Sequence, residues 1–386
     1  MTTLLTAKGS SRVSGRPISV GFVGAGNVLW AYLQTLDRLV PTGEAILGGI
    51  LARNARRRRE LAGRRPGVRL FNNLGELLAT DLDVVVVITP PDTHAELAHS
   101  ALSHGKHVLV EKPFAASVAE GRALIALAAR EHRWLVSAPF AHLSPTFCFL
   151  AERIQRGDIG KVHTARGLYG NSGSHWARWY HQTGGGPLAD LGIYNMKTLT
   201  AVLGPVQRVI HNETRSGRQR IIAGRRMART DPDVAQTMLM HRNGATSVIV
   251  SSHAIVRYDR PGLEFYGSSG TINLRGDDWD PRGVDIWRER RRCWESYAPI
   301  EPTWHWTDGL ADLIRALHQA RPPVADLAHD LHLVELLAAA RESMRTRSAV
   351  SVRSGWKGLL RPYAASGNIA HGKSIVHDHT RPTDSQ

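Results

Sequence analysis

Two stretches of the chain differ in how apolar and polar positions alternate. Between residues 18 and 137, short apolar runs of strand length alternate with segments of helical periodicity. The run at 83–88, DVVVVI, is continuous, which is typical of a parallel strand covered on both faces. The regular alternation of strand and helix predicts a doubly wound parallel sheet of the α/β class.

The pattern changes in the second stretch. Helices are predicted over 146–156 and 188–203, and beyond Gly204-Pro205 the periodicity is that of strands. Two alternating runs flank Asn243-Gly244, which is a strong hairpin signal. Further strand pairs and two helices, over 307–318 and 325–345, complete an α+β domain with an open, largely antiparallel sheet.

The length of 386 residues is too great for one ordinary core and predicts two domains. We expect a disordered lead at 1–16, a first domain at 17–140 and a second domain at 141–353. The polar, glycine-bearing remainder at 354–386 is expected to be a disordered tail.

Composition narrows the class of protein. The net charge of +15 comes mostly from scattered arginines, without a helix-turn-helix, zinc-finger or aromatic RNA-binding motif. Because the arginines are scattered and these motifs are missing, we favour an arginine-biased surface on a protein with an anionic ligand over a nucleic-acid-binding protein. Two cysteines, no apolar run of membrane-spanning length and no secretory pattern lead us to expect a cytoplasmic protein without a membrane partner.

The first strand leads into a glycine turn, Gly24-Ala25-Gly26-Asn27, and then a helix. Gly24 can adopt backbone angles that other residues avoid, and Gly26 lets a ligand approach the backbone closely. The amides from Gly26 to Val28 open a helix whose dipole favours a pyrophosphate. The third glycine of the dinucleotide fingerprint is replaced by Leu29, so a plain structural turn stays an alternative.

The end of the next strand bears on the choice of dinucleotide. An acidic residue there would bind the ribose of NAD, but the chain has Arg53 and no acid before Glu60. Arginine suits the 2′-phosphate of NADP, so NADP is favoured slightly over NAD. The run Arg56–Arg59 is expected to be the solvated face of a helix.

Candidate chemistry in the second stretch lies on and before the helix at 188–203. Asp190 and Tyr194 are four residues apart and face one side, where a carboxylate and a phenol can share adjacent substrate hydroxyls. The alternative is a helix-dipole aspartate and a core tyrosine. The preceding loop offers His175, Trp176 and Trp179 as a substrate wall or a packed lid, and Lys197 is expected to be solvated.

Several segments together resemble the Gfo/Idh/MocA oxidoreductases, which include glucose–fructose oxidoreductase and inositol dehydrogenases. The resemblance covers about residues 18–352. It rests on GFVGAGN, ITPPDTHAELAHSALSHGKHVLVEKPFA, GGGPLADLGIYN and DLHLVELLAAARESM. It implies an NAD(P)-binding Rossmann domain and a substrate and oligomerisation domain, in a homodimer or homotetramer.

The resemblance also implies residue roles. Lys112, in Glu-Lys-Pro, would lie beside the nicotinamide and the substrate hydroxyl, where its ammonium could lower the pKa of Tyr194. The cofactor would lie over the glycine turn and four further segments. These cofactor residues are Gly24, Gly26, Asn27, Val28, Arg53, Thr89, Pro90, His94 and Glu111.

Together with these residues, the resemblance implies an NAD(P)-dependent dehydrogenase or reductase that acts on a sugar, a sugar derivative or an inositol. Tyr194 would exchange the hydroxyl proton, Lys112 would polarise that oxygen and Asp190 would orient the substrate, without a metal. Two alternatives stay open: a non-catalytic NAD(P) sensor of the same fold, and an enzyme that reduces an imine or a tetrapyrrole.

Overall fold

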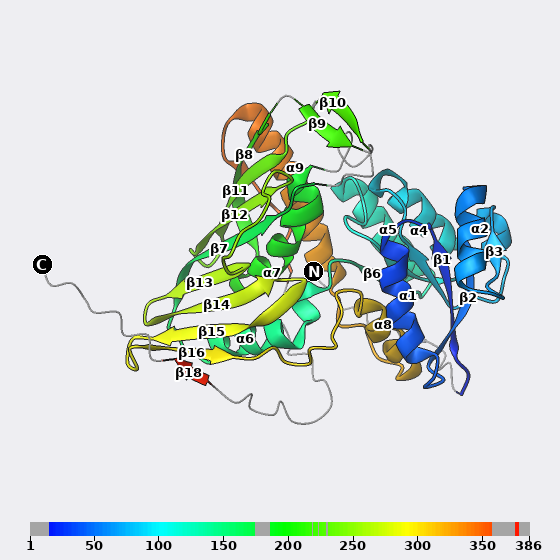
Figure 1. The fold of residues 1–386 in the computed structure, drawn as a ribbon, viewed down its shortest axis with the longest axis horizontal. Coiled ribbons are helices and arrows are strands. Elements are labelled where there is room, and N and C mark those ends of the chain that lie inside the picture. The colour runs from blue at the N-terminus through cyan, green and yellow to red at the C-terminus, as the bar shows by residue number, and fades with distance from the viewer. Residues whose placement is uncertain are drawn as a thin grey trace, which may run out of the picture. The chain divides into compact units, whose positions relative to one another are not determined.

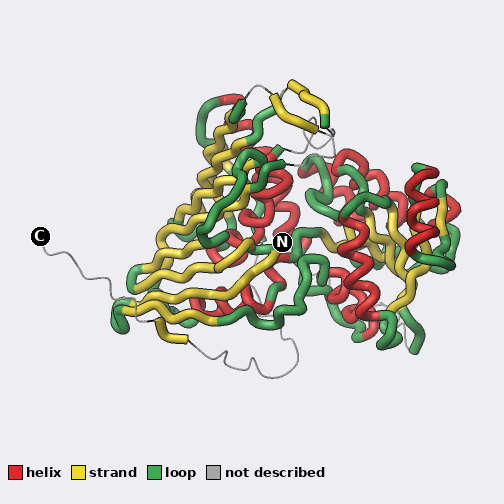
Figure 2. Tube along the Cα trace, in the orientation of Figure 1, coloured by secondary structure: helices red, strands yellow, loops and turns green. Residues whose placement is uncertain are grey.

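The computed structural model describes residues 15–173, 186–217, 219–222, 224–228, 231–356 and 375–377. Contacts group the chain into two compact units. Of the described residues, the first unit joins those up to Phe140 with Thr307–Val334, and the second joins those between 141 and 306 with those from Glu335 onward. Figure 1 labels the elements of both units, and Figure 2 distinguishes their helices, strands and loops. The domain limits expected from the sequence stay a prediction, to which the structure adds that residues 307–334 pack with the first unit.

The first unit is built on a six-stranded sheet with the order β3-β2-β1-β4-β5-β6. All of its strand pairs are parallel. Its strands are β1 (Ile18–Val23), β2 (Ala45–Leu51), β3 (Leu70–Phe71), β4 (Val84–Val87), β5 (His107–Val110) and β6 (Leu135–Ser137). The continuous apolar runs account for this arrangement, because β1 and β4 are buried along their whole length. The predicted doubly wound sheet is therefore confirmed.

The described part of the first unit also contains seven whole helical segments. They are α1 (Val28–Leu39), α2 (Ala55–Arg64), α3 (Leu74–Leu78), η1 (Pro91–Thr93), α4 (His94–Ser103), α5 (Val118–Arg130) and α8 (Gly309–His318). Leu102 of α4 and Leu124 of α5 share a core with Val85 and Val108 of the sheet. Thr35 of α1 and Thr307, just before α8, are joined by a 2.7 Å hydrogen bond between their hydroxyls.

The strand order creates a topological switch point between β1 and β4. The chain proceeds from β1 to β2 and β3 on one side and from β4 to β5 and β6 on the other. Connections that leave β1 and β4 in opposite directions open a crevice at the carboxyl ends of these strands, which is where open α/β sheets bind ligands.

The second unit is built on a ten-stranded sheet with the order β17-β8-β11-β12-β7-β13-β14-β15-β16-β18. Its longer strands are β7 (Val162–Gly170), β8 (Val206–Thr214), β11 (Val234–His241), β12 (Thr246–Ser252), β13 (Leu263–Gly267), β14 (Gly270–Asp277), β15 (Asp280–Arg288) and β16 (Cys293–Tyr297). The pair β7–β12 is parallel and the other pairs are antiparallel. This confirms the largely antiparallel sheet of the second unit.

The remaining elements are helices, the two edge strands of that sheet, β17 and β18, and a separate pair of strands, β9 and β10. They are η2 (Ala141–Leu143), α6 (Pro145–Gln155), η4 (Leu188–Gly192), α7 (Ile193–Leu203), α9 (Leu327–Thr346), which passes from the first unit into the second, and the short strands β9 (Gln219–Ile222), β10 (Arg225–Ala228), β17 (Val350–Ser351) and β18 (Ile375–His377). The pairing of β18 with β16 gives the expected tail one ordered segment. Among the described helices, none is long and apolar enough to cross a membrane.

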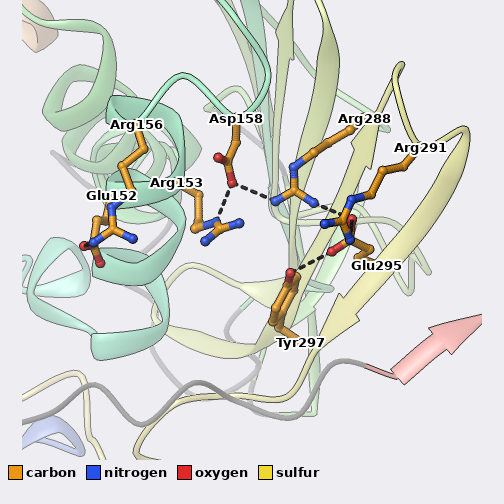
Figure 3. Close-up of polar contacts among 8 residues, drawn as sticks. All are labelled: Glu152, Arg153, Arg156, Asp158, Arg288, Arg291, Glu295 and Tyr297. Carbon is orange, nitrogen blue, oxygen red and sulfur yellow. Dashed lines mark hydrogen bonds and ion pairs between the residues drawn. The ribbon is translucent and has the colours of Figure 1, made fainter.

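A buried ion network ties the segment after α6 to the β15–β16 hairpin (Figure 3). Arg288, whose side chain is 2% exposed, donates to Asp158 at 2.7 Å and pairs with Glu295. The Tyr297 hydroxyl donates to the second Glu295 oxygen at 2.9 Å. Because two carboxylates flank the buried guanidinium, its charge is compensated within the core.

Candidate active site

The glycine turn lies at the carboxyl end of β1. Gly24 has φ +116°, and a Cβ atom there would lie 2.8 Å from the Ile88 carbonyl oxygen, so the turn closely contacts the chain leaving β4. A Cβ atom on Gly26 would meet nothing within 4 Å, so this glycine faces open space. Helix α1 follows directly, and its Leu29 and Trp30 amides donate to the Gly26 and Asn27 carbonyls at 3.2 and 3.3 Å.

Two arginines of the Arg56–Arg59 run donate to backbone carbonyls, one in this turn and one after β2. The Arg57 Nε donates to the Ala25 carbonyl at 2.7 Å, and Arg58 donates to the Ala52 carbonyl at 2.7 Å. The expectation of a solvated face is therefore wrong for these two, which are half-buried, and agrees with the exposure of Arg56 and Arg59. Their guanidinium groups can reach backbone carbonyls because α2 begins directly after β2.

Arg53 lies in the short connection between β2 and α2, and its side chain is exposed. The next residue, Asn54, caps α2 by accepting a hydrogen bond from the Arg57 amide at 3.2 Å. This cap fixes the connection and leaves the Arg53 side chain beyond the strand end, where a phosphate could reach it.

The connection after β4 is held by a buried histidine. The two ring nitrogens of His94 lie 2.8 Å from the carbonyl oxygens of Thr89 and Pro113, and the residue is 1% exposed. Burial lowers the pKa of His94, so the neutral ring carries one N–H and donates to one carbonyl at a time. Both nitrogens face protein atoms, so a direct bond from His94 to a cofactor would have to replace one of these contacts.

Glu111 and Lys112 follow β5 at the same sheet edge. Glu111 is 7% exposed, accepts a 2.8 Å hydrogen bond from the Tyr32 hydroxyl on α1, and accepts a 3.1 Å bond from the Lys112 amide. The Lys112–Pro113 peptide bond is cis. Tyr32 is a contact that the sequence did not indicate, because only the fold brings its helix to the end of β5.

The described residues fit a dinucleotide on the first unit. The open face of Gly26 at the N-terminus of α1 can receive a pyrophosphate, and the exposed Arg53 follows β2 at the same sheet edge, where a ribose phosphate could reach it. Thr89, Pro90, Glu111 and Lys112 follow β4 and β5 at the carboxyl edge of the same sheet. The structure thus places the predicted cofactor residues at one edge.

In the second unit, Asp190 and Tyr194 lie on either side of the junction between η4 and α7. Residues Leu188–Gly192 form a π-helical turn instead of the regular helix expected from the sequence, a distortion found often at functional sites. Tyr194 is 9% exposed. The Asp190 carboxylate lies 3.3 Å from Nε2 of His253, a residue directly after β12 that no motif in the sequence indicates.

Tyr194 packs against the first of two stacked aromatic rings within the second unit. The Tyr169 ring on β7 packs edge to face on Tyr194, with centroids 5.9 Å apart, and stacks on Trp279 at 6.1 Å. Burial, and then the charges of Asp277, Asp190 and Asp278, raise the pKa of Tyr169. That phenol therefore stays protonated at neutral pH.

The remaining predicted residues have different outcomes. His175, Trp176 and Trp179 lie outside the described residues. Lys197 is fully buried on α7, so the expectation of a solvated side chain is wrong. The convergence of Lys112, in the first unit, with Asp190 and Tyr194, in the second, stays a prediction.

Comparison with known protein families gives two matches in succession. Residues 18–138 match the model described as the oxidoreductase family with an NAD-binding Rossmann fold, and residues 147–273 match the GFO/IDH/MocA C-terminal domain.

Similar proteins extend the match over most of the chain. Mouse trans-1,2-dihydrobenzene-1,2-diol dehydrogenase is 26% identical over 337 residues, which cover 84% of this chain and 96% of the relative. A levoglucosan dehydrogenase structure in complex with NADH has a TM-score of 0.77 at 19% identity, over 88% of this chain and 100% of that one. The aldose–aldose oxidoreductase of Caulobacter crescentus, solved with glycerol, has a TM-score of 0.73 at 18% identity, over 87% and 100%. The two structures show a shared fold.

Proposed function

The chain belongs to the Gfo/Idh/MocA oxidoreductase family, and from this premise we propose that it moves a hydride between a nicotinamide and a carbinol or carbonyl carbon of a sugar, a sugar derivative or an inositol. The observation that carries the proposal is the placement of Asp190 and Tyr194 on neighbouring turns of η4 and α7. A carboxylate and a phenol so placed can bind two adjacent hydroxyl groups of one substrate.

NAD or NADP supplies the hydride chemistry when it is bound. The chain's part is to hold the phosphates at Gly24, Gly26, Asn27 and Val28, and to fix Lys112 through Glu111. Arg53, exposed and without a nearby acid in its connection, supports NADP as the preferred dinucleotide.

The proposed proton path uses three residues. Tyr194 exchanges the proton of the reacting hydroxyl, and the Lys112 ammonium hydrogen-bonds that oxygen and stabilises its developing charge. Asp190, held 3.3 Å from His253, orients a neighbouring hydroxyl. Tyr169 cannot replace Tyr194 as the base, because its pKa is raised by burial and by the surrounding carboxylates.

The names of similar proteins support the substrate class. They refer to a dihydrobenzene diol, to levoglucosan and to aldoses. We infer a small polyhydroxylated ring compound as the substrate.

The test is to incubate the whole protein with NAD or NADP and each compound of a panel of sugars and inositols, and to monitor turnover by the absorbance of reduced nicotinamide. We expect turnover with at least one compound, loss of turnover in Lys112→Ala, and dinucleotide affinity in that variant close to wild type. Tight dinucleotide binding without any turnover would favour the sensor instead. Wild-type turnover in Lys112→Ala would remove Lys112 from the mechanism.

We also propose a homo-oligomer that covers the outer face of the ten-stranded sheet. Ile210 and Met238 are opposite each other on β8 and β11 and are 41% and 39% exposed, although both are large and apolar. A dimer or tetramer would bury them. The two free cysteines, Cys148 and Cys293, support a reducing, cytoplasmic location.

A further inference from the structure

A carboxylate at the tip of a hairpin is buried in the second unit. Strands β14 and β15 pair up to Asp277 and Asp280, so Asp278 and Trp279 form the two-residue turn between them. Residues in such turns are normally exposed, but Asp278 is 0% exposed. Burying a carboxylate is unfavourable unless its hydrogen bonds are satisfied, so this placement requires a specific reason.

The partners of Asp278 lie on the helix that carries Tyr194. Oδ2 of Asp278 accepts hydrogen bonds from Nδ2 of Asn195 at 3.0 Å and from Oγ1 of Thr198 at 2.9 Å. Both donors are fully buried, and they follow Tyr194 by one and four residues. Oδ1 of Asp278 has no partner among the described residues. The carboxylate is therefore directed at the first turns of α7.

The same turn reaches Tyr194 by a second route. Trp279 stacks on the Tyr169 ring with an interplanar angle of 30°, and Tyr169 packs edge to face on Tyr194. Asp277, directly before the turn, accepts a hydrogen bond from the Tyr258 hydroxyl, and this bond anchors the turn to the segment after β12. The turn thus contacts two side chains of α7 directly, and it contacts the Tyr194 ring through Tyr169.

We propose that Asp278 and Trp279 are positioning residues for the reaction, which fix α7 so that Tyr194 and Asp190 present their oxygens to the substrate. This inference rests on the proposed function, because it assigns Tyr194 and Asp190 to substrate. Neither Asp278 nor Trp279 exchanges a proton with the substrate in this scheme. Their effect is on the geometry of the groups that do, to which rates are sensitive at the scale of 1 Å.

The chain offers matched variants for a test. Asp278→Ala removes both hydrogen bonds to α7, whereas Asp278→Asn keeps an oxygen that can accept both of them. Thr198→Val removes one donor and keeps the shape of the side chain, and it also serves if Asp278→Ala folds poorly. Asp280→Ala is the control, because Asp280 ends the same hairpin with a side chain that is 56% exposed.

The first measurement is kcat and KM of the full-length protein with its best substrate, per folded molecule. We expect Asp278→Ala to lower kcat by about 10- to 100-fold, with the KM for the dinucleotide changed less than about twofold. Thr198→Val should lower kcat by a smaller factor, and Asp278→Asn should stay within about threefold of wild type. Asp280→Ala should behave as wild type. A purely structural role would lower the melting temperature of Asp278→Ala and leave kcat per folded molecule unchanged, which would overturn the proposal.

The second measurement is hydrogen–deuterium exchange of the peptide that covers residues 190–198, without substrate or cofactor. We expect faster exchange in Asp278→Ala and in Thr198→Val, and exchange as in wild type in Asp278→Asn and Asp280→Ala. Unchanged exchange in Asp278→Ala would overturn the proposal whatever the enzyme does. A wild-type protein without turnover would refute the proposed function alone, and the exchange measurement would still decide whether the turn positions α7.

Discussion

Gly24 and Gly26 are two residues apart and should respond to alanine in opposite ways. At Gly24, φ is +116° and a new Cβ atom would lie 2.8 Å from the Ile88 carbonyl oxygen. At Gly26, the new atom would meet nothing within 4 Å. The first substitution should therefore affect folding, and the second should affect only a ligand that occupies the open space.

The magnitudes follow from these geometries. A side chain in a sparsely populated backbone conformation costs about 1–3 kcal/mol, and the contact with Ile88 adds to that cost. At about 2–4 °C per kcal/mol, Gly24→Ala should melt several degrees below wild type without cofactor. Gly26→Ala should melt as wild type, but its methyl group should hold the pyrophosphate away from the amides of α1. We expect its dinucleotide affinity to fall about tenfold or more, or about 1.4 kcal/mol.

The assays are thermal denaturation of the cofactor-free protein and titration calorimetry with NADP and with NAD. Each variant is the control for the other, because both add one methyl group to the same turn. Wild-type affinity in Gly26→Ala would show that the phosphates do not approach this turn. Wild-type stability in Gly24→Ala would contradict the close contact with Ile88.

Three further outcomes are expected. Arg53→Ala should lower the affinity for NADP in calorimetry by about 10- to 100-fold, the value of a charge-assisted hydrogen bond, and leave the affinity for NAD unchanged. Arg56 is also exposed, and Arg56→Ala should change neither affinity. Equal losses of affinity for NADP and NAD in Arg53→Ala would exclude a 2′-phosphate contact. His241 is 0% exposed, and burial lowers its pKa from 6.5 to about 4, so the neutral ring contributes fully to the free energy of unfolding above pH 6.5. As the pH falls toward 4 this contribution is lost, and the pKa difference of about 2.5 corresponds to about 3 kcal/mol. Denaturant unfolding between pH 6.5 and 4 should show a smaller loss of stability in His241→Gln than in the wild type. The double variant Ile210→Glu with Met238→Glu should shift the mass measured by light scattering toward that of the monomer, and an unchanged oligomer would place the interface elsewhere.

The sequence predicts the elements of the fold better than it predicts their contacts. The run at 83–88 could be assigned to a covered parallel strand because its side chains are apolar on both faces, and β4 is buried throughout. The turn at Asn243-Gly244 could be located because glycine tolerates the positive φ required there, and Gly244 has φ +90°. Both signals are local, so one chain segment is enough to interpret them.

The contacts of the candidate site depend on segments far apart in the sequence. Lys197 looks solvated in its own helix, and Arg57 looks like part of a charged surface, because neither neighbourhood shows what packs against it. Asp278 follows a glycine and an aspartate at a hairpin tip, which resembles an exposed turn. Its burial is decided by α7, about 80 residues earlier.

The hydrogen bond between Tyr32 and Glu111 connects helix α1 to the end of β5, so one helix contacts two parts of the proposed cofactor site. In the proposed complex its first turn would face the phosphates of the dinucleotide, and its second turn contacts the end of β5, from which Lys112 extends. In this proposal, the residues at both ends of an extended cofactor are held by the same helix. Substitutions that tilt α1 would move the glycine turn and the Lys112 ammonium together. We therefore expect the preference for NAD or NADP to evolve through side chains such as Arg53, while the axis of α1 stays fixed.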